Sequence, residues 1–482
     1  MVGDTDYAGV EVSSDESYKK YISLLLFNQY YGIMLLDKNR QMRLNVKWGV
    51  LMRIERTKYL QELIDRKHNG LVKVITGIRR CGKSYLLFTL FYDHLIVEGV
   101  KEENIIKLEL DQTANIKYRN PFEFDKYVRE QIKDNGEMHY VFLDEIQFVE
   151  KVKNPYVENG AEITFYDVLN GLMRISNADI YVTGSNSKML STDILTEFRG
   201  RGDEVRVHPL VFSEYMQAYG GDKFDGWLDY YTYGGLPIIL ERKTDPQKAD
   251  YLVNLFRETY IKDIVERNKV KHVDDLEDLL DVISSCVGSL TNPNRISNTF
   301  KTEKDVDLSK TTIEKYIEYF EDAFLIEETK RFDIKGRKYI NTPKKYYFTD
   351  IGLRNARLNF RQQEENHIME NIIYNELIYR GFSVDIGIVE VREKQDDGTY
   401  KHKQLEVDFI ANKGSQRYYI QSAFEIRSPD KEYQEIRPYT AIEDSFKKIV
   451  VTKDHIKLKR DENGIVTMSI YDFLLKPDSL DL

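Results

Sequence analysis

The sequence is poor in cysteine, with Cys81 and Cys286 as the only two among 482 residues. Two cysteines cannot build a disulfide framework or a four-ligand zinc site by themselves, so a reducing compartment is the simplest expectation. Proline and glycine are also scarce, at 10 and 27 residues, while 31% of the residues are charged. This composition argues against collagen-like, low-complexity and disordered chains and favours a globular fold.

Long apolar runs are missing as well. The longest apolar-leaning stretch, 22–36, is too short to span a bilayer and is interrupted by polar residues. It also lacks the charge-then-apolar layout of a signal peptide. We therefore predict a cytoplasmic protein without a membrane partner. The formal net charge of −10 argues weakly against a nucleic-acid coat protein, although an average conceals local basic patches.

The length of 482 residues suggests about three domains. Residues 1–51 show no clear period, and helical spacing of apolar residues begins only after Met52. Two interpretations of this segment stay open. Either translation starts at Met52 and 1–51 is an upstream extension, or 1–51 is an ordinary N-terminal segment.

The remaining chain divides into four predicted parts. Short apolar strands alternate with amphipathic stretches in the first part, which is typical of a parallel α/β sheet. A mostly helical extension or lid follows. Helices and then a basic hairpin that turns at Lys335-Gly336 indicate a winged-helix region. A helix and alternating strands form a last α/β unit. The predicted boundaries are 52–210, 211–269, 270–357 and 358–482.

The strongest chemical signal matches G-x-x-x-x-G-K-[ST] between an apolar strand and a helical pattern. Glycines let such a loop wrap its amides and a helix N-terminus around phosphates. Lys83 is expected to reach the β- and γ-phosphates of ATP, and Ser84 to hold Mg²⁺. The residues predicted to bind the cofactor are Gly77, Ile78, Arg79, Arg80, Cys81, Gly82, Lys83, Ser84 and Tyr85.

A second apolar strand, 139–143, ends in two carboxylates, Asp144 and Glu145. At the carboxyl end of a parallel strand, Asp144 is expected to complete the Mg²⁺ site and Glu145 to orient the attacking water. Each could instead be a cap or turn residue. The pairing with Lys83 favours the catalytic interpretation.

A third strand, 179–182, runs into small polar residues that include Thr183, Ser185 and Asn186. In a nucleotide site, such residues sense the γ-phosphate or position water, but they are also common turn residues. Further on, Arg199 and Arg201 are candidates to supply positive charge to the transition state. Arg201 would act within its own chain or toward a neighbouring subunit of a homo-oligomer, and a solvated salt bridge is the alternative.

Together these segments resemble the prokaryotic AAA-type ATPases that carry a C-terminal DUF4143 domain. The resemblance runs from about Met52 to the C-terminus. The segments that carry it are Gly77–Ser84, Val141–Gln147, Thr183–Ser187 with Gly200-Arg201, Tyr233–Pro237, Lys262–Arg267, Tyr347–Leu353, Glu370–Leu377 and Glu406–Phe409. It implies a P-loop NTPase sheet with an additional strand, a winged-helix region and a C-terminal α/β domain related to restriction endonucleases.

Restriction-like nucleases use a helix glutamate, a strand aspartate and a Glu/Gln-x-Lys strand to bind Mg²⁺ and activate water. Glu370 or Glu376, Asp408 and Gln421 fit the first three positions, but the lysine position is Ala423. Lys403 and Lys413 have no spacing that supports them as replacements. An ATP-regulated nuclease is therefore a weak alternative, and a degenerate fold for binding DNA or a protein is favoured.

The predicted wing, 330–345, is strongly basic, which makes contact with the phosphates of DNA a candidate role. Against it stands the ordinary solvated charged face, and an upstream helix, 310–320, that carries Glu314 and Glu318. The seven basic residues, opposed only by Asp333, are Lys330, Arg331, Lys335, Arg337, Lys338, Lys344 and Lys345.

The function favoured by the sequence is ATP hydrolysis coupled to the binding of DNA or of a protein partner. The main alternative is a nucleotide-dependent switch that binds ATP but barely turns it over.

Overall fold

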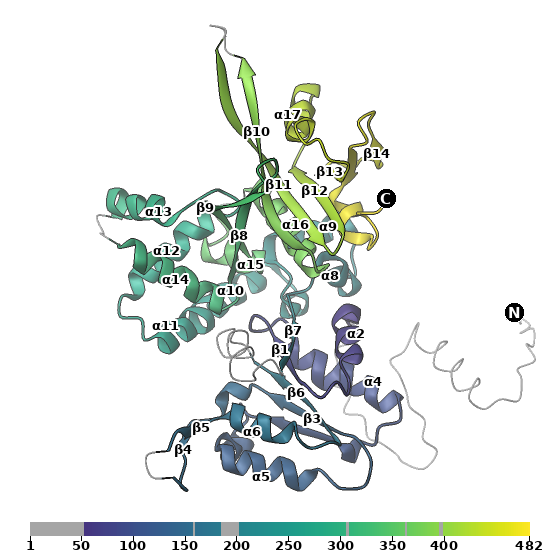
Figure 1. Ribbon diagram of the computed structural model, residues 1–482, viewed down its shortest axis with the longest axis vertical. Coiled ribbons are helices and arrows are strands. Elements are labelled where there is room, and N and C mark those ends of the chain that lie inside the picture. Colours follow the sequence, from purple (N-terminus) through teal and green to yellow (C-terminus); the bar gives the residue numbers. More distant parts are fainter. Residues whose placement is uncertain (1–52, 158–159, 185–201, 305–307, 362–363, 395–398) are drawn as a thin grey trace, which may run out of the picture. The chain divides into compact units, whose positions relative to one another are not determined.

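The computed structural model of the chain describes residues 53–157, 160–184, 202–304, 308–361, 364–394 and 399–482 (Figure 1). These residues belong to one compact unit that begins at Met52. Residues 1–51 lie outside the described ranges, so both interpretations of that segment stay open.

The first sheet has five parallel strands in the order β2-β3-β6-β1-β7. All residues of β1 and β3 are buried, as expected for parallel strands covered on both faces. Strand β6 lies between β1 and β3, which is the additional strand implied by the resemblance. The sequence analysis did not predict β7. The strands are β1 (Val72–Thr76), β2 (Ile105–Glu109), β3 (His139–Asp144), β6 (Ala178–Thr183) and β7 (Gly202–Arg206).

Helices connect these strands, and a two-stranded hairpin is inserted after β3. The helix that follows the β1 loop continues from α3 through a π-helical segment, Leu86–Phe91, into α4. The elements are α2 (Thr57–Asp65), α3 (Lys83–Tyr85), α4 (Tyr92–Val97), α5 (Pro121–Gln131), β4 (Val152–Lys153), β5 (Glu162–Ile163) and α6 (Phe165–Leu172).

The middle of the chain is helical, as predicted. Its helices share one apolar core with the first sheet, because Phe91 of the sheet domain, Ile261, Leu280 and Ile317 belong to the same buried cluster. Burying each such side chain contributes about 1.5–3 kcal/mol. The helices are α8 (Phe212–Tyr219), α9 (Lys223–Tyr233), α10 (Asp245–Leu255), α11 (Lys262–Asn268), α12 (Val273–Ser285), α13 (Pro293–Thr299) and α14 (Lys310–Asp322).

The second sheet is mixed and has eight strands in the order β14-β15-β13-β12-β11-β10-β8-β9. The hairpin predicted as a wing is β8 with β9, and it is also the edge of this sheet, because β8 pairs in parallel with β10. Three helices, α12 to α14, precede it in the predicted order. The strands are β8 (Ile326–Asp333), β9 (Lys338–Phe348), β10 (Ser383–Lys394), β11 (Tyr400–Lys413), β12 (Gln416–Ala423), β13 (Lys447–Thr452), β14 (Lys459–Arg460) and β15 (Val466–Ser469).

Four helices accompany this sheet, and the one predicted at 368–379 is α16. It packs against β10 and β12 and carries the two candidate helix carboxylates. The helices are α15 (Ile351–Arg357), α16 (Glu365–Tyr379), α17 (Pro429–Thr440) and α18 (Ile470–Leu475).

Candidate nucleotide site

The loop after β1 forms a tight turn that rests on Val207, the residue that follows β7. Gly77 has φ +135°, and a Cβ atom there would lie 2.1 Å from the carbonyl oxygen of Val207. Gly82, at φ +100°, gives the turn into α3. Both positions need glycine, because other residues rarely adopt such angles. Cys81 is buried and its Sγ donates to the carbonyl oxygen of Val207 at 3.3 Å.

Lys83 is the buried cation of this loop. Its Nζ donates to the carbonyl oxygens of Gly77 at 2.9 Å and Ile78 at 3.1 Å. The ammonium group is therefore held over the turn by neutral acceptors, which the oxygens of a phosphate can replace with a stronger, charge-assisted bond. The nine predicted cofactor-binding residues form one continuous turn and helix start, and Tyr85 closes it as the last residue of α3.

The side chains of Ser84 and Asp144, which the sequence analysis expects to share a Mg²⁺ ion, lie against each other. Its Oγ is 2.9 Å from one carboxylate oxygen of Asp144 and 3.1 Å from the other. The hydroxyl of Thr183 donates to the same carboxylate. Burial raises the pKa of Asp144, and these two hydrogen bonds oppose the rise. A hydroxyl and a carboxylate oxygen are donors that suit Mg²⁺.

Glu145 follows directly and has a left-handed backbone, with φ 53°. Its amide donates to Thr183 Oγ1 at 3.1 Å, and its carboxylate accepts a hydrogen bond from the side chain of Gln147. A non-glycine residue in this conformation is uncommon and is often found at functional sites. The backbone therefore changes direction at Glu145, whereas Asp144 is still the last residue of β3.

Thr183 therefore links the second and third signals of the sequence, since its hydroxyl donates to the carboxylate of Asp144 and accepts from the backbone amide of Glu145. The other polar candidates after β6 cannot be placed: Asn186 and Arg201, together with Ser185 and Arg199, lie outside the described residues.

A cavity of 440 Å³ opens beside this site, between the loop and the middle helices. Arg79 lines it and pairs with Asp263 of α11 at 2.8 Å, while the hydroxyl of Tyr260 donates to the backbone oxygen of Arg79 at 2.7 Å. Burial raises the pKa of Asp263, the charge of Arg79 opposes the rise, and Glu266 and then Glu145 add to it. Sequence reasoning did not single out Asp263 or Arg267, which also lines the cavity, although both fall within the 262–267 landmark.

A second polar cluster lies in the eight-stranded sheet. Lys345 of β9 is buried, and its Nζ lies 2.8 Å from Glu370 Oε1 and 2.7 Å from Glu406 Oε1. Tyr347 donates to the same oxygen of Glu370 at 2.6 Å. Burial, and then the charge of Glu370, raises the pKa of Asp408 well above its ordinary value.

The candidate nuclease residues of the sequence lie in or near this cluster. Asp408 lies beside Gln421 and Ser422, whose amide donates to Asp408 Oδ2 at 2.7 Å. Of the two candidate carboxylates of α16, Glu370 acts on the charge of Asp408, whereas Glu376 pairs with Arg380 at 2.8 Å. The cation comes from the hairpin and not from Lys403 or Lys413. Among the described residues, no group of three or more metal-binding side chains is arranged to hold a metal ion.

The same finding shows that the seven basic residues of the predicted wing do not all face solvent. Lys345 and Arg331 are buried, and Lys344 pairs with Glu328. The exposed ones are Lys330, Lys335, Arg337 and Lys338. In an extended strand, alternate side chains point to opposite faces, so a count of charge could not separate Lys344 from Lys345.

None of the described helices combines the length and the apolar character needed to cross a bilayer.

Two family models match the chain. One describes an AAA domain and covers residues 69–216, and the other is a domain of unknown function, DUF8612, over residues 225–364. The second match falls on landmarks that resembled DUF4143, and the DUF4143 assignment stays a prediction.

Related proteins cover most of the chain. An uncharacterized protein of Haemophilus influenzae is 33% identical over 428 residues, which is 88% of this chain and 99% of that protein. An uncharacterized protein of Methanocaldococcus jannaschii is 28% identical over 384 residues, 76% of this chain and 78% of that protein.

Among solved structures, the Aeropyrum pernix ORC1 protein in complex with DNA is 10% identical and covers 64% of this chain and 93% of its own, with a TM-score of 0.28. DnaA from Aquifex aeolicus bound to AMPPCP is 14% identical and covers 57% of this chain and 88% of its own, with a TM-score of 0.27. The assignment rests on the family model and the sequence relative: the chain belongs to the family of the Haemophilus influenzae protein and carries an AAA-type P-loop ATPase domain.

Proposed function

We propose that the protein binds ATP·Mg²⁺ and hydrolyses it, and that the nucleotide state controls contact with DNA. The observation that carries the proposal is the meeting of Ser84, Asp144 and Glu145 at the carboxyl ends of two parallel strands, directly beside the Lys83 loop. Ser84 and Asp144 would hold the metal, which supplies positive charge at the phosphates when bound.

The protein residues divide the remaining work. Lys83 exchanges its carbonyl acceptors for phosphate oxygens and neutralises charge that grows in the transition state. Glu145 accepts a proton from water as the water oxygen bonds to the γ-phosphorus. The bond to the oxygen that bridges the β- and γ-phosphates breaks, and ADP and phosphate leave. Gln147 positions Glu145 through its hydrogen bond.

Steady-state phosphate release tests this assignment. We expect Glu145→Gln to lower turnover by about 10²-fold while ATP still binds, because only the proton acceptor is lost. Lys83→Ala should weaken ATP binding itself. Wild-type turnover no higher than that of Glu145→Gln, with or without DNA, would exclude the ATPase assignment. The alternative, a nucleotide-dependent switch that barely turns over ATP, would then stand.

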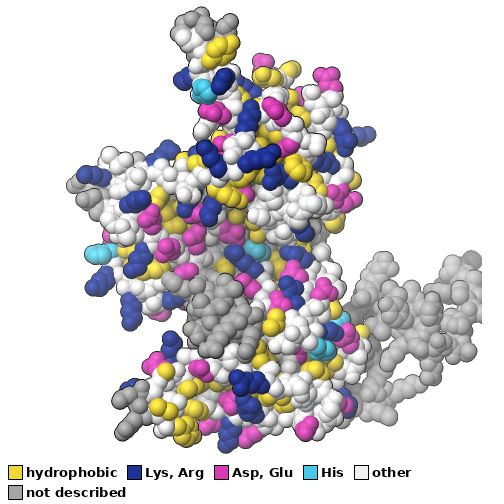
Figure 2. All heavy atoms as spheres, viewed as in Figure 1, with side chains coloured by type: hydrophobic (Ala, Val, Ile, Leu, Met, Phe, Trp, Pro, Cys, Tyr) yellow, Lys and Arg dark blue, Asp and Glu magenta, His cyan; other side chains and the backbone are white. Residues whose placement is uncertain are grey.

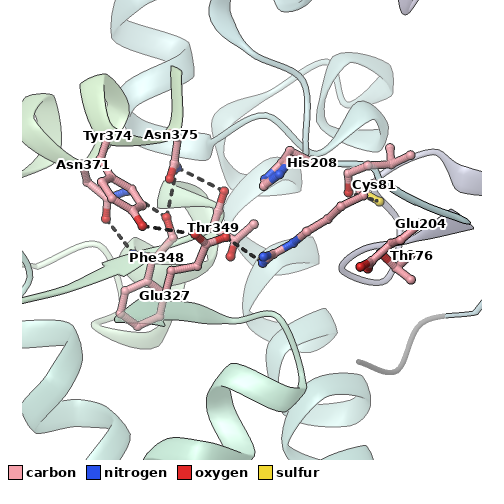
Figure 3. A network of polar contacts seen from close by, with 12 residues as sticks. Thr76, Cys81, Glu204, His208, Glu327, Phe348, Thr349, Asn371, Tyr374 and Asn375 are labelled. Atoms are coloured by element: carbon pink, nitrogen blue, oxygen red, sulfur yellow. Dashed lines mark hydrogen bonds and ion pairs between the residues drawn. The ribbon is translucent and has the colours of Figure 1, made fainter. Parts of the chain in front are cut away.

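A series of polar contacts supports coupling between the nucleotide loop and the second sheet (Figure 3). Thr76, the last residue of β1, donates to Glu204 of β7 at 2.5 Å. Two residues further along β7, Arg206 pairs with Glu327 of β8 at 2.6 Å, and Tyr374 of α16 donates to Glu327 at 3.2 Å. A change in the loop can therefore reach the hairpin through one strand.

Arg206→Met tests the coupling, because it removes this polar contact between β7 and β8 and leaves the apolar core that joins the two parts in place. We expect the basal ATPase rate to stay and the change of rate caused by duplex DNA to disappear. Arg66→Met is the matched control, since Arg66 pairs with Asp203 of β7 at 2.9 Å but directly follows α2 and makes no ion pair with the described residues of the second sheet. If duplex DNA changed the ATPase rates of the two variants equally, coupling through Arg206 and Glu327 would be contradicted. No effect of DNA on the wild type would favour a protein partner.

We further propose that the C-terminal part is a restriction-endonuclease-like module, as the resemblance implies. Phosphodiester cleavage is the second candidate function, and the placement of Lys345 beside Glu370 and near Asp408 favours it. Mg²⁺-dependent nicking of plasmid DNA that is lost in Asp408→Ala would support it. Nicking retained in that variant would indicate a contaminant.

A further inference from the structure

Arg79, the third residue of the nucleotide loop, joins the loop to the middle helices. Its guanidinium lies 2.8 Å from the carboxylate of Asp263, in the first turn of α11. Its backbone oxygen accepts a hydrogen bond at 2.7 Å from the hydroxyl of Tyr260, in the π-helical segment Phe256–Ile261 that runs into α11. The loop is therefore anchored to these helices at two points, and of the two only the ion pair of Arg79 can pass to a phosphate.

The cavity of 440 Å³ beside the nucleotide site begins at this contact. Arg79 lines it from the loop, Gln147 from the chain after β3, and Asp263 from α11. Gln147 donates to the carboxylate of Glu145, so the cavity adjoins the acid that is proposed to receive a proton from the attacking water. That water bonds to the γ-phosphorus, so the γ-phosphate is the part of ATP that comes close to this cavity. ADP ends one phosphate earlier.

The ion pair of Arg79 is weak enough to be exchanged. The side chains of Arg79 and Asp263 are 33% and 45% exposed, and pairs at such exposure change an equilibrium by no more than about 5-fold. A guanidinium bonds a phosphate through two parallel, charge-assisted hydrogen bonds. A terminal phosphate carries a charge of about −1.5 to −2, more than a carboxylate does. Exchange of Asp263 for a γ-phosphate is therefore favourable.

We propose that Arg79 distinguishes ATP from ADP. When ATP binds, the guanidinium leaves Asp263 and bonds to oxygens of the γ-phosphate, and the first turn of α11 loses one of its two anchors on the loop. When ADP binds, the pair with Asp263 stays. The inference rests on the proposed binding of ATP and names the residue that reads the nucleotide state. Because α11 contacts α14, the helix that precedes β8, the change is passed towards the second sheet.

Affinities for ATP and ADP test the discrimination. The full chain is titrated with fluorescent ATP or ADP and Mg²⁺, in the Glu145→Gln background so that ATP is not consumed. Arg79→Met should lower the affinity for ATP by about 10-fold or more, which is the effect of losing one hydrogen bond to a charged group, and leave the affinity for ADP unchanged. The unchanged affinity for ADP also shows that the loop is still folded.

Asp263→Asn should have the opposite effect. It should raise the affinity for ATP by up to about 5-fold, because the carboxylate that competes for Arg79 is gone, and leave the affinity for ADP unchanged. When Asp263→Asn is combined with Arg79→Met, this gain should vanish, because no guanidinium remains to be released.

Glu266→Gln is the matched control. Glu266 is an exposed carboxylate of the same helix and lines the same cavity, but it pairs with Lys262, at 3.9 Å. Figure 2 shows Lys and Arg side chains interspersed with Asp and Glu side chains over the visible side of the middle helices, so the loss of one exposed carboxylate should not change the field of this side as a whole. The affinities of Glu266→Gln for ATP and ADP should equal those of its parent.

Hydrogen exchange of the α11 amides tests the loss of the anchor. In the Glu145→Gln chain, the amides of residues 262–268 should exchange faster with ATP than with ADP. The amides of α5, whose buried side chains belong to another apolar cluster, should exchange equally with both nucleotides. In Asp263→Asn, the α11 amides should exchange fast with either nucleotide.

Three results would overturn the inference. An equal loss of ATP and ADP affinity in Arg79→Met would make Arg79 a support of the loop. A gain from Asp263→Asn that persists without Arg79 would show that the carboxylate only repels phosphate. Equal exchange of the α11 amides with ATP and ADP would separate the ion pair from the nucleotide state. A chain that binds neither nucleotide would remove the proposed function as well.

Discussion

Lys345 offers the sharpest test of the structure, because its neighbour in the sequence is a built-in control. Lys345→Met removes the cation between Glu370 and Glu406, at 2.8 and 2.7 Å, from a side chain that is only 4% exposed. Removing one partner of a buried ion pair costs about 3–5 kcal/mol, since a charge stays buried without compensation. Against a typical total stability of about 5–15 kcal/mol, this is a large loss.

The pH dependence of the loss has a defined sign. In the wild type, burial would raise the pKa of Glu370, but Lys345 lowers it, so this carboxylate stabilises the fold above its unfolded pKa and the contribution is lost as pH falls. Without Lys345, burial is no longer opposed by this cation, so the folded-state pKa of Glu370 should rise above the unfolded value. The stability of Lys345→Met should therefore fall as pH rises from about 4 to 8.

Thermal and urea unfolding of the full chain at pH 5 and pH 8 measure this effect. Lys344→Met is the control, because Lys344 pairs with Glu328 at 27% and 20% side-chain exposure, and a pair of this kind contributes about 0–1 kcal/mol. The double variant Lys345→Met with Glu370→Gln should recover part of the loss. Equal unfolding of the Lys344 and Lys345 variants at both pH values would refute the buried position of Lys345.

Three further outcomes are expected. Burial, and then a nearby glutamate, raises the pKa of Glu321 to about 7, so the wild type loses stability as pH rises from about 4.5 to 7. The variant Glu321→Gln should be up to about 3 kcal/mol more stable than the wild type at pH 8 and equally stable at pH 4. Unfolding curves of the two proteins that coincide at pH 8 would contradict this. Gly77→Ala should abolish ATP binding in a fluorescent-nucleotide titration, because the added Cβ would lie 2.1 Å from a carbonyl oxygen. The control Gly70→Ala has φ +74° but open space around it, so it should bind ATP normally at a strain cost of about 1 kcal/mol. Similar ATP affinities of the two variants would exclude the close packing of Gly77 against Val207. Lys73, fully buried on β1, pairs with Asp179, so Lys73→Met should cost about 3–5 kcal/mol in thermal unfolding, and a cost under about 1 kcal/mol would place the lysine in solvent.

The nucleotide loop could be predicted because its signal is local. The glycines, Lys83 and Ser84 are adjacent in the sequence, and the buried strands before them are continuous apolar runs. Asp144 followed by the same reasoning, since parallel strands bring their carboxyl ends to one edge. Strand β7 could not be predicted so readily. Its residues, Gly-Asp-Glu-Val-Arg, are mostly polar, and only Val205 is fully buried.

The second cluster needed long-range information. Lys345 meets partners 25 and 61 residues further along the chain, and no short motif joins them. A weaker signal was present, because Lys345 and Tyr347 share one face of a strand that becomes fully buried at its end. Charge alone placed Lys345 in solvent. The apolar run that follows it, Tyr346 to Phe348, was the signal that this end of the strand is buried.

The contact between the nucleotide loop and β7 sets an order on how the protein is made. The loop residues from Thr76 to Cys81 are supported by Glu204 and Val207, which leave the ribosome some 126–128 residues later. A nascent chain, or a truncated fragment, that ends before 202 carries the whole G-x-x-x-x-G-K-[ST] motif but lacks the surface on which the loop rests. The ability to bind nucleotide should therefore be absent while the motif alone has been made, and should appear in a single step once β7 and Val207 have been added.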